Sequence, residues 1–223
     1  GSGIDYVIDQ VGSIFETIND AYAFPCNGTQ VWTNMHGSMK KHHEATMVEE
    51  IGEESFYKLC RILITEHNRI VGQNPDMPLT GNFIDNRVST LNFCPPGRGC
   101  NVEQRRKFVE LDSERGIREK SYEVLRGLLN KFGMRNSVDI ALGGNTSIDV
   151  YPRGWDKTYA MRHFTRSDRF DKVFFVGDRC DEGGNDKAIY DLLQPEGRSF
   201  KTTSPENTIE IIHKQLIPAL EGL

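Results

Sequence analysis

The densest group of chemically useful side chains lies in residues 177–186, which read GDRCDEGGND. This segment follows an apolar run, KVFFV at residues 172–176, that predicts a buried parallel strand, and it precedes a predicted helix. Ligands of open α/β sheets bind beyond the carboxyl ends of the strands, and carboxylate oxygens suit Mg²⁺. We therefore interpret Asp178 and Asp186 as candidate Mg²⁺ ligands. The alternative is a solvated acidic turn near the start of a helix.

Three arginines form a second candidate group. Arg98 lies in a rigid turn, CPPGRG at residues 94–99, while Arg87 precedes this turn and Arg105 lies near the start of a predicted helix. A guanidinium group binds phosphate through two parallel hydrogen bonds, and a helix N-terminus adds positive potential. The set therefore indicates an anion site, although each arginine taken alone is more often an ordinary surface residue.

Ser147 and Asp149 are two residues apart in a predicted strand, so their side chains share one face. A hydroxyl and a carboxylate on one face could bind the hydroxyl groups of a sugar. The alternative is the polar, solvent-facing side of a half-buried strand. Lys157 could neutralise a phosphoryl group, or it could be simply a lysine in the first turn of a helix.

The elements that must position these residues differ between the ends and the middle of the chain. Helices are expected over residues 4–18, 47–71, 102–114, 117–132, 156–163, 185–193 and 204–220. Strands are expected over residues 29–33, 82–87, 90–93, 136–142, 147–151, 172–176 and 199–203. Because both ends are α/β and the middle is rich in hairpins, one domain inserted into another is favoured over two domains in tandem. We predict core residues 1–45 and 154–223 around an inserted domain at 46–153.

Composition excludes several classes of protein. The 223 residues include 27 Lys or Arg and 32 Asp or Glu, so the net charge of −5 argues against a general nucleic-acid binder. No apolar run approaches the about 18 residues of a transmembrane helix, so no membrane association is expected. The five cysteines are odd in number and lack a C-x-x-C pattern, which disfavours disulfides and structural zinc and favours a reducing cytosol.

Three long motifs together resemble the eukaryotic-type phosphomannomutase family of the haloacid dehalogenase superfamily. They are NFIDNRVSTLNFCPPGRGC at residues 82–100, GGNTSIDVYPRGWDK at 143–157 and FFVGDRCDEGGND at 174–186. FPCNG at residues 24–28 also resembles the short loop that precedes the family's cap domain. The resemblance covers nearly the whole chain, and the combination of the three motifs is specific although no single motif is.

The resemblance implies an α/β fold, with a Rossmann-like haloacid dehalogenase core and an inserted α+β cap. It implies interconversion of hexose 6-phosphate and hexose 1-phosphate, of mannose or glucose, through an aspartyl-phosphate and a bisphosphorylated sugar. It further implies Mg²⁺ as cofactor, a hexose bisphosphate as activator, a homodimer formed through the cap, and a cytoplasmic role in mannose metabolism and GDP-mannose biosynthesis.

The resemblance also implies a role for each candidate residue. In the cap, the residues that bind the non-reacting phosphate would be Arg87, Arg98 and Arg105. Ser147 and Asp149 would bind the sugar. In the core, Lys157 would lie near the reacting phosphate, Asp178 would be the Mg²⁺ carboxylate, and Asp186 would complete the acidic loop.

One departure from the family is serious. The family begins with a strand ending in D-x-D-G-T, whose first Asp attacks phosphorus, and no D-x-D occurs in these 223 residues. Because Gly1-Ser2-Gly3 resembles the family's second core loop, we expect a missing N-terminal β-loop-helix unit of about 30 residues. The chain alone is then expected to be inactive. The alternatives are a sugar phosphatase of the same superfamily and a non-catalytic sugar-phosphate-binding module.

Overall fold

The computed structural model describes residues 3–18, 21–35, 38–164 and 170–221 of the chain. Its contacts group the chain into two compact units, unit 1 being Gly1–Trp155 and unit 2 being Asp156–Leu223. Gly1 and Ser2 of the predicted N-terminal turn lie outside the described residues. The predicted division into residues 1–45, 46–153 and 154–223 stays a proposal. In the described part of the chain, no helix combines the length and apolar character needed to cross a membrane.

A four-stranded antiparallel sheet in unit 1 carries the two predicted sugar-binding residues, Ser147 and Asp149. Its strands, in spatial order β4-β5-β7-β6, are β4 (Ile84–Asn86), β5 (Leu91–Phe93), β7 (Ser147–Pro152) and β6 (Val138–Gly143). The predicted hairpin at residues 136–151 is confirmed, with Gly143 opposite Ser147 at its end. Successive side chains alternate between the two faces of a strand, so the sheet has one apolar and one polar face.

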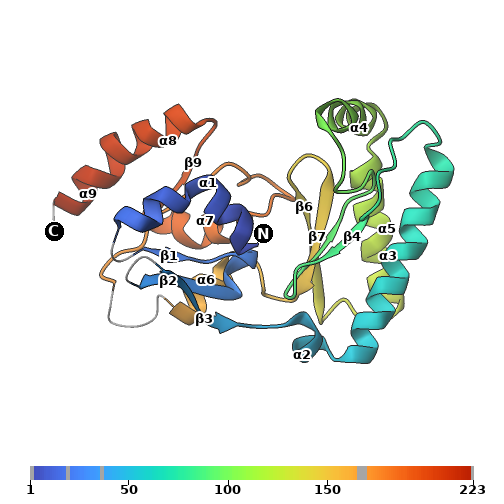
Figure 1. Cartoon of the computed structure of the whole chain (residues 1–223), viewed down its shortest axis with the longest axis horizontal. Coiled ribbons are helices and arrows are strands. Elements are labelled where there is room, and N and C mark those ends of the chain that lie inside the picture. Colours follow the sequence, from blue (N-terminus) through green and yellow to red (C-terminus); the bar gives the residue numbers. More distant parts are fainter. Residues whose placement is uncertain (1–2, 19–20, 36–37, 165–169, 222–223) are drawn as a thin grey trace. The chain divides into compact units, whose positions relative to one another are not determined.

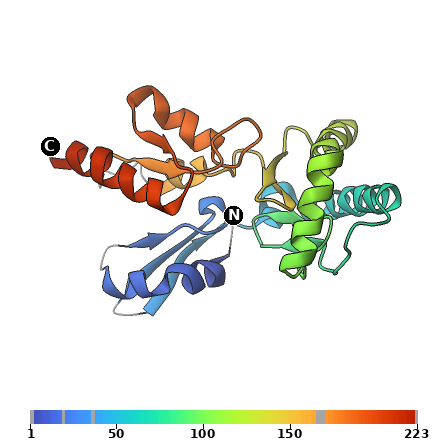
Figure 2. The same cartoon turned by 90° about the horizontal axis from the view of Figure 1, so that it is seen from above.

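Helices α3 (Glu53–Gln73) and α5 (Ile117–Lys131) lie along one side of this sheet, as Figures 1 and 2 show. Helix α2 (Met47–Ile51) contacts β7, and α4 (Val102–Arg115) packs against α5. Apolar side chains from sheet and helices form a single core cluster, which includes Leu63, Phe93, Phe108, Leu125 and Ile148. All buried members of this cluster lie between Met47 and Val150, which supports the proposal that residues 46–153 form a domain.

The helix expected over residues 47–71 is two helices in the structure. Gly52 separates α2 from α3. Its φ of +81° is a backbone conformation that residues with a side chain rarely adopt, and the helical hydrogen bonds start again after it. Thr46 caps α2 by accepting a hydrogen bond from the Glu49 N–H. The start of α4 is fixed by a capping box, in which Asn101 and Gln104 exchange side-chain to backbone hydrogen bonds.

The first part of unit 1 is a helix followed by a three-stranded antiparallel sheet. These elements are α1 (Ile4–Thr17), β1 (Tyr22–Ala23), the 3₁₀ turn η1 (Cys26–Gly28), β2 (Gln30–Met35) and β3 (Ser38–Glu44). Strand β3, with the sequence SMKKHHE, was not predicted from the sequence. Among the residues that the structure describes, it pairs with β2 alone, and it is largely exposed, so it lacks the alternating apolar residues that normally reveal a strand.

Unit 2 contains the acidic loop. Its elements are α6 (Thr158–Phe164), β8 (Phe175–Gly177), α7 (Lys187–Leu193), η2 (Gln194–Glu196), β9 (Ser199–Lys201), α8 (Pro205–Ile211), the π-helical turn η3 (Ile212–Leu216) and α9 (Ile217–Glu221). Strand β8 pairs in parallel with β9, and α7 packs against both. The strand is shorter than the predicted 172–176 and half-buried, because β9 is its only strand neighbour in the described part of the chain.

Candidate functional site

The polar face of the four-stranded sheet brings several candidate residues into one row. Asp85 of β4 is opposite Asn92 of β5, and Asn92 is opposite Asp149 of β7. Residues that face each other across strands project to the same side of the sheet. The alternate residues, such as Phe93 and Ile148, are fully buried in the apolar core on the other side.

Ser147 and Asp149 meet through a residue that the sequence did not single out. The Asn92 Nδ2 atom donates to Ser147 Oγ at 3.0 Å and to Asp149 Oδ1 at 2.7 Å. Ser147 Oγ in turn donates to the Gly143 carbonyl at 3.0 Å. All three side chains are at most 5% exposed, so this is not a solvent-facing polar surface. A side chain at Gly143 would lie 2.9 Å from the Asp149 carboxylate, so glycine leaves room for this group.

Arg87 is held on the same side of the sheet. Its Nε atom donates to Asp85 Oδ2 at 3.0 Å, and its side chain is only 15% exposed. The turn after it is tied to the loop at residues 24–29, because Cys26 Sγ donates to the Arg87 carbonyl and Thr29 Oγ1 donates to Ser89 Oγ at 2.6 Å. The backbone of the Arg87 segment is therefore fixed by contacts from a distant part of the sequence.

Arg98 and Arg105 follow β5 along the chain and are both exposed. The Arg98 turn is closed by hydrogen bonds from the Gly97 N–H to the Cys94 carbonyl and from the Arg98 N–H to the Asn82 carbonyl. Arg105 lies in the first turn of α4. In the described residues, neither guanidinium group has a carboxylate partner, so both are available to an anion.

His67 supports the Arg98 turn from α3, and sequence reasoning missed it. Its Nε2 atom lies 3.0 Å from the Pro95 carbonyl oxygen, and because a carbonyl only accepts, the histidine is the donor. Its ring lies 4.0 Å from the ring of Phe83. Nothing in the sequence links residue 67 to residue 95, since only the packing of α3 against the turn brings them together.

The acidic loop of unit 2 is organised around Asp186, which is 1% exposed. Its Oδ1 atom accepts a short hydrogen bond from Lys157 Nζ, and its Oδ2 atom accepts from the Arg179 N–H at 3.0 Å. A side chain at Gly177 would come within 2.7 Å of Asp186 Oδ2, so a larger residue there would displace this carboxylate. The structure thus brings two predicted residues, Lys157 and Asp186, into direct contact.

The two predicted Mg²⁺ ligands differ in their fitness for a metal ion. The Asp178 side chain is 71% exposed and lies 4.0 Å from the Arg179 guanidinium, so its oxygens are free to coordinate a metal ion. Both oxygens of Asp186 already accept hydrogen bonds, one of them from the Lys157 ammonium group, whose positive charge opposes a metal ion at the same carboxylate. No group of three or more Asp, Glu, His or Cys side chains is arranged to hold a metal within the ranges that the structure describes. Asp178 is therefore better suited than Asp186 to hold a metal ion.

The three buried cysteines, Cys26, Cys94 and Cys180, offer no activated nucleophile. All five cysteines are thiols rather than disulfides, and burial raises the pKa of the Cys26, Cys94 and Cys180 thiols. A raised pKa lowers the fraction of reactive thiolate at neutral pH.

We expect Ellman's reagent at about pH 7.5 to leave Cys26, Cys94 and Cys180 unmodified in the native chain and to modify all five cysteines in guanidinium chloride. Rapid modification of Cys94 in the native chain would contradict the burial.

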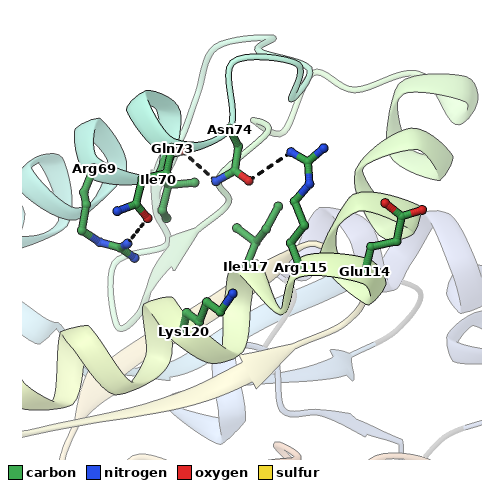
Figure 3. Close-up of a pocket in the computed structure, with 8 residues that line it drawn as sticks. All are labelled: Arg69, Ile70, Gln73, Asn74, Glu114, Arg115, Ile117 and Lys120. Carbon is green, nitrogen blue, oxygen red and sulfur yellow. Dashed lines mark hydrogen bonds between the residues drawn. The ribbon is translucent and has the colours of Figure 1, made fainter.

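A pocket of about 350 Å³ lies among α3, α4 and α5, and Figure 3 shows its lining. Its two arginines are already engaged: Arg69 binds the buried Glu66 through two hydrogen bonds, and Arg115 binds Asp76 and Asn74. None of the predicted site residues lines this pocket. It is therefore not the phosphate site that the sequence predicts.

Comparison with known proteins gives consistent matches to one family. The sequence model of the eukaryotic phosphomannomutase family matches residues 1–218. A phosphomannomutase of Encephalitozoon cuniculi is 33% identical over 217 residues, which cover 97% of this chain and 78% of that protein. A phosphomannomutase of Drosophila melanogaster is 31% identical over 215 residues, which cover 95% of this chain and 78% of that protein.

Among solved structures, an N-terminally truncated Plasmodium falciparum IMP-nucleotidase is similar to this chain with a TM-score of 0.61 at 9% identity. The match covers 93% of this chain, and the chain spans 56% of the length of that protein. A likeness at such low identity concerns the fold alone. It confirms the predicted α/β fold class.

Proposed function

Because the chain belongs to the eukaryotic phosphomannomutase family, we propose that it interconverts hexose 6-phosphate and hexose 1-phosphate as part of a complete enzyme. The observation that carries this proposal is the pair of exposed guanidinium groups, Arg98 and Arg105, without carboxylate partners in the described residues. A mutase must hold a hexose bisphosphate by both phosphates while the sugar reorients. Guanidinium groups with no competing carboxylate suit the phosphate that is not reacting.

In this proposal unit 1 binds the sugar and the non-reacting phosphate. Arg98 and Arg105 bind the phosphate together with Arg87, whose orientation is set by Asp85. Asp149 accepts hydrogen bonds from sugar hydroxyls, and Ser147 Oγ binds a further hydroxyl. The buried network around them supports this role, because a preorganised polar group loses little entropy on binding.

Unit 2 supplies the charge for the reacting phosphate. Lys157 neutralises the phosphoryl oxygens, and Asp186 orients its ammonium group. Mg²⁺, when bound, would stabilise the charge of the transferring phosphoryl group. Asp178 is the residue best suited to hold it, whereas a ligand role for Asp186 stays a prediction. The acidic loop therefore fits an oxygen-ligated divalent cation only in part.

We propose that the phosphoryl group passes through an aspartyl-phosphate on a D-x-D segment that these 223 residues do not contain. The chain alone then shows no turnover. Activation by a hexose bisphosphate, a homodimer formed through the cap, and a cytoplasmic role in mannose metabolism also remain predictions of this proposal.

The test is an assay of the chain with and without an added N-terminal strand-loop-helix segment bearing D-x-D-G-T. Isomerised hexose phosphate and free phosphate are measured separately, with mannose 1-phosphate and glucose 1-phosphate as substrates. We expect isomerisation only with the added segment. Full turnover by the 223-residue chain would refute the proposal that the nucleophile lies outside it. Release of free phosphate without isomerisation would favour the sugar phosphatase, and binding without turnover in both forms would favour the binding module.

A further inference from the structure

Asn92 is a buried polar residue at the centre of the predicted sugar site. It lies in β5 between Leu91 and Phe93, which both project into the apolar core, while its own side chain projects to the polar face. It is 2% exposed, and it contacts both Ser147 and Asp149. Nothing in the sequence motifs assigns it a role.

The surrounding hydrogen bonds fix which way the Asn92 amide faces. The hydrogen of Ser147 Oγ is donated to the Gly143 carbonyl, so this oxygen must accept from Asn92. An ionised Asp149 carboxylate can only accept. Both Nδ2 hydrogens of Asn92 are thus used, and rotating the amide by 180° would direct its oxygen at a carboxylate oxygen now 2.7 Å from the nitrogen.

The amide oxygen is left with nothing to bind. Asn92 Oδ1 is buried and has no hydrogen-bond donor among the residues that the structure describes. Buried carbonyl oxygens without a donor are rare in proteins, because water is lost and nothing replaces it. The contacts with Ser147 and Asp149 account for the Asn92 nitrogen, but they do not account for an amide oxygen buried without a donor.

We infer that Asn92 is a third sugar-binding residue, whose Nδ2 positions Ser147 and Asp149 and whose Oδ1 accepts a hydrogen bond from a hydroxyl group of the bound hexose phosphate. This inference rests on the proposed function. It adds to the predicted site a polar group that recognises the sugar rather than the phosphate. Loss of Asn92 should therefore weaken binding of a hexose phosphate and leave binding of inorganic phosphate unchanged.

The test is calorimetric titration of the full 223-residue chain with mannose 6-phosphate and, separately, with inorganic phosphate. We expect Asn92→Ala and Asn92→Asp to weaken mannose 6-phosphate binding by about tenfold or more, since a site built around a hydroxyl loses its specificity when the partner is removed. The matched control is Asn74→Ala, which removes another buried asparagine amide, bonded to the Ile70 carbonyl at the end of α3. It should leave mannose 6-phosphate binding unchanged.

A measurement on the unmodified chain protects the test against variants that fail to fold. The side-chain amide resonances of Asn92 should shift when mannose 6-phosphate is added and stay in place when inorganic phosphate is added. Binding of mannose 6-phosphate with unshifted Asn92 resonances, or with equal affinity in a folded Asn92→Ala chain, would overturn the inference alone. A chain that binds no hexose phosphate at all would overturn the proposed function as well.

Discussion

Replacing Gly97 by alanine should destabilise unit 1 by about 4 kcal/mol or more. Gly97 has φ of +95°, which strains any residue with a side chain, and an added Cβ would lie 2.2 Å from the Gly81 carbonyl oxygen. The neighbouring atom is backbone, so it cannot rotate away. The turn that carries Arg98 would therefore have to separate from the segment at residues 80–81.

Hydrogen exchange of peptides from residues 80–100, followed at increasing guanidinium chloride concentration, measures this effect at the turn itself. Two control variants separate the causes. Gly81→Ala has φ of +80° but open space around the new Cβ, so strain alone should cost about 1–2 kcal/mol. Gly127 lies in the middle of α5 on its exposed side, where an added Cβ meets no neighbour. Gly127→Ala should therefore stabilise unit 1 by about 0.5–1 kcal/mol. Equal effects at Gly97 and Gly81 would contradict the close approach.

Replacing Lys157 by methionine should destabilise unit 2 by about 2–4 kcal/mol, because it leaves the Asp186 carboxylate buried without its cation. The value lies below that of a fully buried pair, since the Lys157 side chain is 34% exposed and its charge is partly screened. The suitable measurement is hydrogen exchange of peptides from residues 172–201, because it reports the opening free energy of unit 2 by itself.

The double variant Lys157→Met with Asp186→Asn is the control for this experiment. It removes both charges and keeps an acceptor for the Arg179 N–H, so it should be more stable than Lys157→Met alone. Additive losses in the double variant would show that the two side chains act independently. The same variants should lose mutase activity in the completed enzyme if Lys157 neutralises the reacting phosphate.

The sequence predicted the elements whose signals are local. Helices α4 and α5 have apolar residues at helical spacing and clear boundaries, and the hairpin of β6 and β7 has glycines at its turn. Strand β3 was missed because it is polar and largely exposed. The break at Gly52 was missed because apolar residues continue at helical spacing on both sides of it, although the backbone there has a positive φ.

The candidate site was predicted in its members but not in its contacts. Ser147 and Asp149 were found because their types and spacing are visible in one strand. Asn92 joins them from 55 and 57 positions away in the sequence, so only the pairing of β5 with β7 reveals it. Asp186 was interpreted as a metal ligand because its loop is acidic. Its hydrogen bond with Lys157 could not be predicted, because only the fold brings together two residues that are 29 positions apart.

The two faces of the four-stranded sheet have a consequence for how such a protein can diverge. Along β5 and β7, positions 91, 93, 148 and 150 belong to the apolar interior, whereas positions 92 and 149 lie between them on the polar face. In the proposed sugar site, a codon change at position 92 or 149 would alter recognition while the interior remains packed. Descendants of one ancestral gene can therefore drift toward different sugars without first evolving a new scaffold.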